Sequence, residues 1–540
     1  MKKMKKLASF VLAMMMTLAM VISAFAATVT VPSDSILKDH TFTAYQVFSG
    51  RQENGVLSDV QWGSGIDSTA FLAALKADTT YGSLFTDCTD AAAVAKVLGD
   101  NNTNTALANA VAKLAYANKK GTGTALTSGG NTLADGYYLV VDTTANVGQG
   151  GAYNTALLQV VGDINITVKT DAPTVEKKVL EDDKYKQDGG YGTGYNDVAD
   201  YNMGDAVPFK LIGSVPDMSR YDTYKYIFHD TLSTGLTLNE DSIKVYVASD
   251  KAGTGKTEIT GWTKAVNGQS FTVSFTDLKT VNGVSQGKYI IVEYTATLNE
   301  NAVVGLKGNT NTVYLEYSNK PDQSGSGDTD NTGNTPEDKV IVFTYELDTT
   351  KVDGQDNTKK LEGAEFVLYK KGTTDEDNLY AVLNHDKKTI EWEKAQTTIV
   401  DGKSVVTYPV GSTLTSDADG LFRVIGLDDG TYYLKETKAP ATYNLLSSEI
   451  TVVITATTAN GQTWTAGEAA SALTNLVVTA DGTAGTGDKS SGIAGITVAN
   501  NKGATLPETG GMGTTLFYLV GGILVIAAIV LLITRKRMSK

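Results

Sequence analysis

Two lysines occupy positions where a strand pattern turns them toward an apolar core. Side chains alternate between the two faces of a β-strand, so residues two apart share a face. Lys177 shares its face with Val175 and Val179, and Lys351 shares its face with four apolar residues, Ile341, Phe343, Tyr345 and Leu347. An apolar core disfavours the ammonium form and lowers the pKa of a lysine, so the nucleophilic neutral amine becomes accessible.

The same alternation turns carboxyl and amide groups inward. Asp230 follows Tyr226 and Phe228, and Glu436 follows Tyr432 and Leu434, each in parity. Burial raises the pKa of a carboxyl, which can then protonate an amide carbonyl and pass a proton to departing ammonia. The inward asparagines are Asn319, which follows Val313, Leu315 and Tyr317, and Asn500, which follows Ile496 and Val498.

Each lysine could therefore form an amide with an asparagine without an external enzyme. The predicted sets are Lys177 with Asn319 and the carboxyl of Asp230, and Lys351 with Asn500 and the carboxyl of Glu436. On the residues alone, a second interpretation is open: each lysine extends to the rim of its domain, and each asparagine caps a turn.

The two ends of the chain carry signals of export and attachment. Residues 1–26 combine four lysines, an apolar stretch at 7–22 and the small-residue site Ala24-Phe25-Ala26, which predicts a removable signal peptide. Near the other end, an apolar run at 516–533 is long enough to span a bilayer, and the basic residues after it face the cytoplasm. Read alone, that run could be an ordinary membrane anchor.

A pentapeptide precedes the apolar run: Leu506, Pro507, Glu508, Thr509 and Gly510. The order of pentapeptide, hydrophobic helix and basic tail resembles a sortase sorting signal. The resemblance implies cleavage between Thr509 and Gly510, after which the Thr509 carboxyl is joined to an amine.

Composition excludes several classes of function. The chain has 60 Asp and Glu against 46 Lys and Arg, a net charge of −14, and no basic patch that would indicate nucleic-acid binding. Cys88 is the only cysteine, so the chain has no disulfide of its own, and we expect a buried, inert thiol.

The three histidines, His40, His229 and His385, have no metal or catalytic spacing. We therefore expect no cofactor, no metal site and no enzyme activity beyond single-turnover amide formation.

The mature chain divides into three predicted β-rich regions. Residues 27–171 mix strands with Ala-rich helical segments at 68–76 and 90–118, and residues 172–319 alternate short strands with Gly, Asn and Asp turns, as in an antiparallel sandwich. A polar linker is predicted at 320–338, a second sandwich at 339–505 and the sorting signal at 506–540. The predicted fold is mainly β, with tandem sandwich domains, helices added to the first, an N-terminal signal peptide and a C-terminal transmembrane helix.

Several segments resemble the isopeptide-forming, Ig-like Cna-type domains of Gram-positive major pilins. They are APTVEKKV with GNTNTVYLEYSNKP, and TTKVD, LEGAEFVLYK, GTYYLKETKAPATY and ITVANNKGATLPETGG. The resemblance is strong from residue 173 onward and implies Lys351 bonded to Asn500 with Glu436 as catalyst. It likewise implies Lys177 bonded to Asn319 with Asp230 as catalyst.

The family also uses one exposed lysine near the end of the first domain for polymerisation. Here INITVKTDAP occupies that place without the Tyr-Pro-Lys-Asn context of the family. Strand parity turns Ile164 and Ile166 inward and Lys169 outward, so Lys169 is the candidate, with the outward Lys178 as its rival. Lys38 is the lysine to test for a crosslink within the first domain, although no partner for it is evident.

The leading hypothesis is a structural shaft subunit of a pilus, used for adhesion at the surface of a Gram-positive cell. Its expected partners are pilus-type and housekeeping sortases, other copies of itself, minor pilins, peptidoglycan and, during assembly, the membrane. The alternative is a singly wall-anchored adhesin or minor pilin that binds a host or microbial ligand. A wall-anchored hydrolase is disfavoured because no paired catalytic motif is found, although carboxylate pairs distant in sequence stay open.

Overall fold

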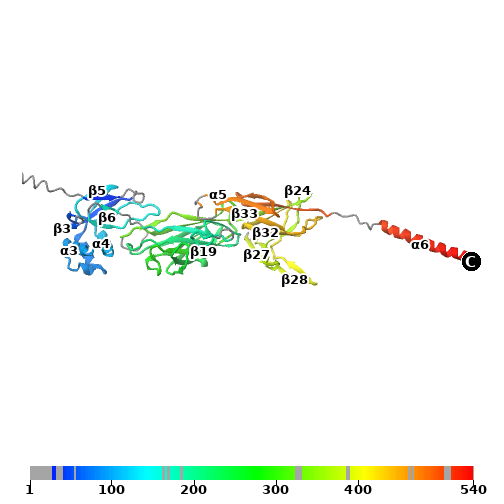
Figure 1. Ribbon diagram of the computed structural model, residues 1–540, viewed down its shortest axis with the longest axis horizontal. Coiled ribbons are helices and arrows are strands. Elements are labelled where there is room, and N and C mark those ends of the chain that lie inside the picture. The colour runs from blue at the N-terminus through cyan, green and yellow to red at the C-terminus, as the bar shows by residue number, and fades with distance from the viewer. Residues whose placement is uncertain are drawn as a thin grey trace, which may run out of the picture.

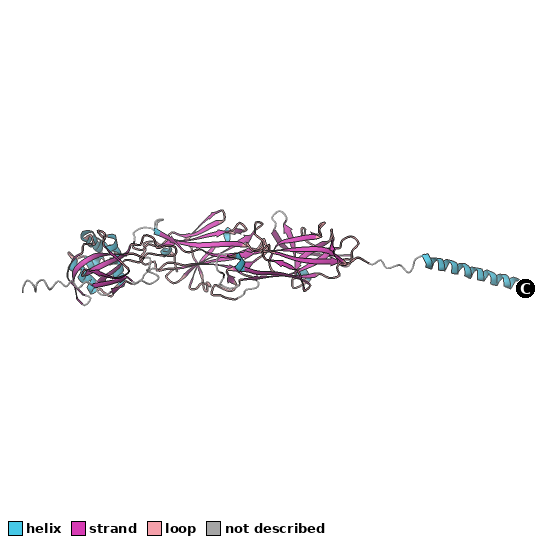
Figure 2. Ribbon diagram, turned by 90° about the horizontal axis from the view of Figure 1, so that it is seen from above, coloured by secondary structure: helices cyan, strands magenta, loops and turns pink. Residues whose placement is uncertain are grey.

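The molecule is a row of three β-rich units that ends in a separate helix (Figure 1). The computed structural model describes residues 27–31, 40–53, 56–160, 164–166, 171–182, 187–322, 331–384, 389–459, 464, 468–503 and 512–538. The predicted signal peptide at 1–26, the pentapeptide Leu506–Gly510 and Lys169 lie outside these residues. Strands run along most of the length, with short helices in the N-terminal unit and one long helix at the C-terminal end (Figure 2), which confirms the mainly β prediction.

The first unit packs helices against a sheet ordered β3-β2-β6-β7, beside a small sheet ordered β5-β1-β8. Asp67, Asp90 and Asn104 cap the helices by accepting backbone N–H bonds. The segment predicted as one helix at 90–118 is two, because residues 101–104 are poor helix formers and one of them caps the second helix. Cys88 is buried, and burial raises the pKa of its thiol. The elements are β1 (Ala27–Val31), β2 (Phe42–Glu53), β3 (Val56–Trp62), α2 (Ser68–Ala77), η1 (Gly82–Phe85), α3 (Ala91–Asp100), α4 (Thr105–Ala117), β4 (Thr124–Leu126), β5 (Gly129–Leu133), β6 (Gly136–Asp142), β7 (Leu157–Val160) and β8 (Ile164–Asn165).

The middle unit is a sandwich of two seven-stranded sheets. One sheet is ordered β10-β9-β12-β19-β15-β16 with β14 on β19, and the other is ordered β11-β22-β20-β13-β18-β17 with β21 on β20. The inward residues of both sheets form one apolar core. The elements are β9 (Val175–Leu180), β10 (Tyr195–Asn196), β11 (Val198–Asp200), β12 (Ala206–Ser214), β13 (Tyr226–Leu232), β14 (Leu236–Leu238), η2 (Glu240–Ser242), β15 (Lys244–Ala248), β16 (Thr257–Glu258), β17 (Thr263–Asn267), β18 (Ser270–Phe275), η3 (Leu278–Thr280), β19 (Tyr289–Leu298), β20 (Asn309–Ser318), β21 (Thr332–Asn334) and β22 (Asp338–Phe343).

The C-terminal unit is a second sandwich, with sheets ordered β24-β23-β37-β36 and β27-β26-β25-β32-β33-β34-β35. Its first strand, β23, pairs in parallel with its last, β37, over eight residues. A separate hairpin of β28 and β29 extends from its side (Figure 1). The elements are β23 (Tyr345–Asp353), β24 (Asp356–Lys360), β25 (Glu365–Lys370), η5 (Asp375–Asp377), β26 (Leu379–Asn384), β27 (Thr389–Lys394), β28 (Gln396–Val400), β29 (Lys403–Thr407), β30 (Leu414–Thr415), β31 (Leu421–Leu427), β32 (Gly430–Lys438), β33 (Ile450–Thr458), α5 (Ala469–Ala472), β34 (Leu473–Ala480), β35 (Thr483–Ala484), β36 (Thr486–Asp488) and β37 (Ile493–Asn500).

The junction between the two sandwiches differs from the predicted boundary at residue 339. β22 hydrogen-bonds to β20 and β11 of the middle unit, and β23 begins the C-terminal unit, so only Thr344 separates them. Thr344 is fully buried; its hydroxyl donates to Leu427 O at 3.2 Å, and its carbonyl accepts from the Gly305 N–H. Part of the predicted linker at 320–338 forms β21, which pairs with β20.

The last element is α6 (Met512–Met538). Its segment Phe517–Met538 is long and apolar enough to cross a membrane. Its final turn carries Arg535, Lys536 and Arg537. The structure therefore agrees with the transmembrane helix predicted at 516–533.

Candidate functional site

The C-terminal unit brings Lys351, Asn500 and Glu436 together in its core. Lys351 lies on β23 and Asn500 on β37, and the parallel pairing aligns Lys351 with Val498, two residues before Asn500. The Lys351 side chain is fully buried. Its Nζ donates to Asn500 Oδ1 and, at 3.2 Å, to Val498 O, and lies 3.8 Å from Glu436 Oε1. The amine therefore faces the amide that it was predicted to attack.

Asn500 and Glu436 are held by each other and by one loop. Asn500 Nδ2 donates to Glu436 Oε2 at 2.9 Å and to Asn444 O at 2.7 Å. The Leu446 N–H also donates to Glu436 Oε2, at 2.8 Å, while Oε1 has no hydrogen-bond partner among the described residues. Burial lowers the pKa of Lys351 to about 8, although the charge of Glu436 acts in the opposite direction. A sizeable fraction of the amine is thus neutral near pH 8.

The middle unit contains a second buried cluster, built across its two sheets. Lys177 on β9 and Tyr294 on β19 come from one sheet, and Asp230 on β13 and Asn311 on β20 come from the other. Lys177 Nζ donates to Asp230 Oδ2 and, at 2.9 Å, to the Tyr294 hydroxyl. The Tyr294 hydroxyl donates to Asp230 Oδ2 at 3.0 Å and accepts from Asn311 Nδ2 at 2.8 Å. All four side chains are buried.

The structure does not bring Asn319 to this cluster and so corrects the predicted set. Asn319 follows the end of β20, and its backbone N–H donates to Asn331 O. Asp230 pairs with Val313, six positions earlier, which places Asn319 roughly 20 Å further along the strand. Asn311 has the same parity as Asn319 and lies beside Tyr294. The amide of the middle cluster is therefore that of Asn311.

Burial drives the charged groups of the middle cluster toward their neutral forms. Desolvation lowers the pKa of Lys177 and raises the pKa of Asp230, while their mutual attraction acts in the opposite direction on both. Asp230 Oδ1 and Asn311 Oδ1 are both buried without a hydrogen-bond partner among the described residues. A proton on Asp230 Oδ1 would make that oxygen a hydrogen-bond donor. The cluster is thus arranged as an amine, a carboxylic acid and an amide.

Of the two lysines considered for polymerisation, the structure describes one. Lys178 was predicted to point outward, yet it is buried, and its Nζ donates to Asp197 Oδ1 at 2.5 Å and lies over the Tyr191 ring. It faces away from the sandwich core as parity requires, but the segment that carries Tyr191 and Asp197 covers it. Lys178 is therefore not an accessible amine, and Lys169 lies outside the described residues.

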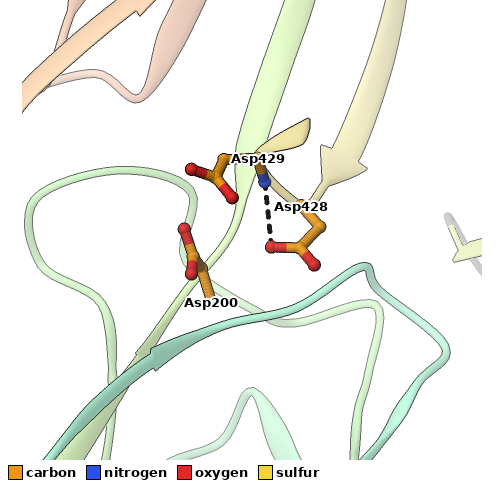
Figure 3. Close-up of side chains that lie close together, drawn as sticks. All are labelled: Asp200, Asp428 and Asp429. Carbon is orange, nitrogen blue, oxygen red and sulfur yellow. Dashed lines mark hydrogen bonds between the residues drawn. The ribbon is translucent and has the colours of Figure 1, made fainter. Parts of the chain in front are cut away.

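A group of acidic residues that the sequence did not indicate lies where the two sandwiches meet. Asp200 comes from β11, and Asp428 and Asp429 come from the turn between β31 and β32 (Figure 3). One carboxylate oxygen of each lies within 4.8 Å of the others, and all three residues are buried. Asp200 accepts from the Tyr345 hydroxyl at 2.9 Å, and the Asp428 N–H donates to Asn202 Oδ1 at 3.1 Å. These bonds join the middle unit to the C-terminal one.

Comparison with known proteins gives three family matches along the chain. Residues 203–321 match the Gram-positive pilin backbone subunit 2, Cna-B-like domain. Residues 345–467 match a prealbumin-like fold domain, SpaA, and residues 498–540 match the LPXTG cell wall anchor motif. Together these matches cover more than half of the chain.

One curated relative is the trypsin-resistant surface T6 protein of Streptococcus pyogenes serotype M6. It is 26% identical over 364 residues, which are 62% of this chain, and the match spans 65% of the length of that relative. Among solved structures, the T6 backbone pilin of serotype M6 S. pyogenes is 17% identical with a TM-score of 0.49, covering 89% of this chain and 99% of that one. The group B streptococcus pilus 2b backbone protein is 26% identical with a TM-score of 0.39, covering 57% and 97%.

The order of the matched domains along the chain is the same as the order of the units in the structure. The backbone-pilin match lies within the middle sandwich, the SpaA match begins at Tyr345 with β23, and the anchor match contains α6. The chain therefore carries a Gram-positive backbone-pilin domain, a SpaA domain and an LPXTG cell wall anchor motif, in that order.

Proposed function

We propose that this chain is the shaft subunit of a sortase-assembled pilus, polymerised covalently, anchored to the cell wall and used for adhesion. The observation that carries the proposal is a backbone-pilin domain and a sorting signal on one chain, with a buried lysine, carboxyl and asparagine cluster in each of two sandwiches in a row. A shaft subunit must hold its neighbours by covalent bonds and resist extension between them.

Polymerisation uses the sorting signal and a lysine of another copy. A pilus-type sortase breaks the Thr509–Gly510 peptide bond and holds the Thr509 carboxyl as an acyl-enzyme. Lys169 Nζ of the next subunit attacks that carbonyl, and the new amide releases the sortase. Repetition of this step gives a linear polymer to which minor pilins can be joined. A housekeeping sortase then transfers the last Thr509 carboxyl to an amine of peptidoglycan, while α6 keeps the precursor at the membrane.

Within each sandwich, the buried cluster forms an internal amide once. The neutral Nζ of Lys351 attacks Cγ of Asn500 while Glu436 protonates the carbonyl oxygen. Glu436 then takes up the proton that Nζ loses and passes a proton to Nδ2, so the Cγ–Nδ2 bond breaks with loss of ammonia and Glu436 is restored. The middle cluster joins Lys177 to Asn311 by the same chemistry, with Asp230 as the acid. In a chain with no disulfide of its own, these bonds restrict the unfolded state.

The test of polymerisation is a wall extract probed for this chain after boiling in detergent. The wild type should give a ladder of high-mass bands, and Lys169→Ala should collapse the ladder to the monomer. Lys178→Ala is the matched control: it removes a neighbouring lysine that is buried in an ion pair, and it should keep the ladder. A single band from the wild type would contradict the proposal and favour a singly anchored adhesin or minor pilin.

The test of the internal bonds is the intact mass of the chain. A chain with both bonds is lighter than its sequence by two molecules of ammonia. A mass equal to that of the sequence would contradict the internal bonds but would not bear on polymerisation.

A further inference from the structure

The hydroxyl of Tyr294 touches every reactive side chain of the middle cluster. It accepts hydrogen bonds from Lys177 Nζ at 2.9 Å and from Asn311 Nδ2 at 2.8 Å, and it donates to Asp230 Oδ2 at 3.0 Å. The two nitrogens that exchange a proton during amide formation therefore share one oxygen. Three hydrogen bonds at a buried phenol are more than packing requires, since one partner would satisfy it.

The ring of Tyr294 is fixed by its neighbours in the core. It stacks on Phe209 with centroids 5.5 Å apart and meets Phe271 edge to face at 4.9 Å. The residue is nearly inaccessible to solvent, at 2% exposure. The hydroxyl consequently has one position, and it lies between the nucleophile and the leaving group.

In the C-terminal cluster, the described contacts connect the acid to the leaving nitrogen without a hydroxyl between them. Asn500 Nδ2 donates directly to Glu436 Oε2 at 2.9 Å. In the middle cluster the acid is an aspartate, shorter by one methylene. Asn311 Nδ2 donates to the Tyr294 hydroxyl, which in turn donates to Asp230 Oδ2. Tyr294 thus connects the leaving nitrogen to the acid in the middle cluster, whereas the longer glutamate of the C-terminal cluster reaches that nitrogen directly.

We propose that Tyr294 is a catalytic residue of the middle cluster, which relays a proton from Lys177 Nζ to the leaving nitrogen of Asn311. The role rests on the proposed function, because it presupposes the internal amide. As Nζ bonds to Cγ of Asn311, Asp230 Oδ1 gives its proton to the Asn311 carbonyl oxygen, Nζ gives a proton to the tyrosine oxygen, and the tyrosine passes its own proton to Asp230 Oδ2. As the Cγ–Nδ2 bond breaks, the carbonyl oxygen returns its proton to Asp230 Oδ1, Asp230 Oδ2 returns its proton to Tyr294, and Tyr294 passes one proton to Nδ2, which leaves as ammonia. One bond forms, one breaks, and Tyr294 and Asp230 end unchanged.

The experiment follows amide formation in the full chain, recovered unfolded in urea from inclusion bodies and refolded in detergent. Samples are quenched over time and digested, and the two crosslinked peptides are quantified by mass spectrometry. Tyr294→Phe should slow the Lys177–Asn311 bond by at least about tenfold, since a positioned proton-transfer group contributes that much or more. The Lys351–Asn500 bond of the same molecules should form at the wild-type rate and serves as an internal control.

The matched variant is Tyr226→Phe, which removes a buried hydroxyl from the same core. The Tyr226 hydroxyl donates to Ser214 O, outside the cluster. Tyr226→Phe should leave the rate at which the Lys177–Asn311 bond forms unchanged. If Tyr226→Phe slowed this bond as much as Tyr294→Phe does, the slowing would be due to core packing, and the catalytic role of Tyr294 would be wrong. A wild-type rate in Tyr294→Phe would also overturn it. A wild type that never forms the middle bond would instead contradict the internal amide itself.

Discussion

The middle and C-terminal sandwiches place their lysines alike and their asparagines differently. Lys177 and Lys351 each lie on the first strand of their unit, β9 and β23. Asn500 lies on β37, the last strand of the C-terminal unit, whereas Asn311 lies on β20 and is followed by β21 and β22. The position of the asparagine decides how much of each unit remains outside a covalent path from one end to the other.

In the C-terminal unit, the proposed amide joins the first strand to the last. A pull along the chain then passes from β23 through Lys351 to Asn500 and bypasses residues 352–499. In the middle unit the path passes from Lys177 to Asn311, and residues 312–343 remain in series with it. Hydrogen bonds to β20 and β11 hold β22, together with the burial of four apolar residues, Val340, Ile341, Val342 and Phe343.

The largest difference between the two sandwiches is expected when a single chain is stretched. The wild-type C-terminal unit should not lengthen, whereas Asn500→Ala should release residues 352–499, about 500 Å of chain at roughly 3.3 Å per residue. The middle unit should release no more than residues 312–343, about 100 Å. Asn501→Ala, which alters the exposed neighbour of Asn500, is the control and should behave as the wild type. Full extension of the wild-type C-terminal unit would contradict the covalent path.

The unfolding free energy of the C-terminal unit should also depend on the Lys351–Asn500 bond. Closing the loop between Lys351 and Asn500 is worth about 5 kcal/mol of unfolding free energy on chain-entropy grounds. Asn500→Ala should therefore destabilise the C-terminal unit by about that amount, and further because Lys351 loses its buried partner. Urea unfolding of the full chain in detergent, followed by tryptophan fluorescence, measures the change, and a midpoint equal to that of the wild type would refute it.

The rate of amide formation should depend on pH more steeply in the C-terminal unit. The pKa of Lys351 is lowered to about 8, so the reactive neutral amine grows as pH rises through 8. The refolding rate of the Lys351–Asn500 bond should increase about tenfold from pH 7 to pH 9. Burial moves both Lys177 and Asp230 toward neutrality, so the middle bond should respond less. Equal profiles for the two bonds would contradict this difference.

The smallest expected effect is at Asn319. Asn319→Ala should leave both amides in place, because the structure puts this residue at the far end of β20 from the cluster. Asn311→Ala should be lighter than its own sequence by one molecule of ammonia, where the wild type is lighter by two. Intact mass distinguishes the two variants, and the reverse result would restore the pairing predicted from sequence.

Strand parity predicted the faces of these side chains well and their positions along the strand less well. Lys351, Glu436 and Asn500 meet as expected, because β23 and β37 pair in register and the inward face of β32 lies opposite them. Asn309, Asn311 and Asn319 all share one face of β20 or its extension, so parity cannot choose among them. The choice depends on the register between β13 and β20, which no local pattern encodes.

Other parts of the site had no signal in the sequence. Tyr294 lies between Val292 and Ala296 on an inward face, where an aromatic residue reads as ordinary core. Lys178 was placed on the correct face, but alternation does not reveal the segment that covers it. Asp200 and the pair Asp428 and Asp429 are more than two hundred residues apart, and only the docking of the two sandwiches brings them together.

The single residue between β22 and β23 has a consequence for the shape of a fibre. Thr344 is buried and hydrogen-bonded on both its hydroxyl and its carbonyl, so no free backbone remains about which the two sandwiches could pivot. A polymer of such subunits has two modules in each repeat that act as one rigid rod. Its bending is confined to the remaining joints, and its persistence length is set by how many of them each repeat contains.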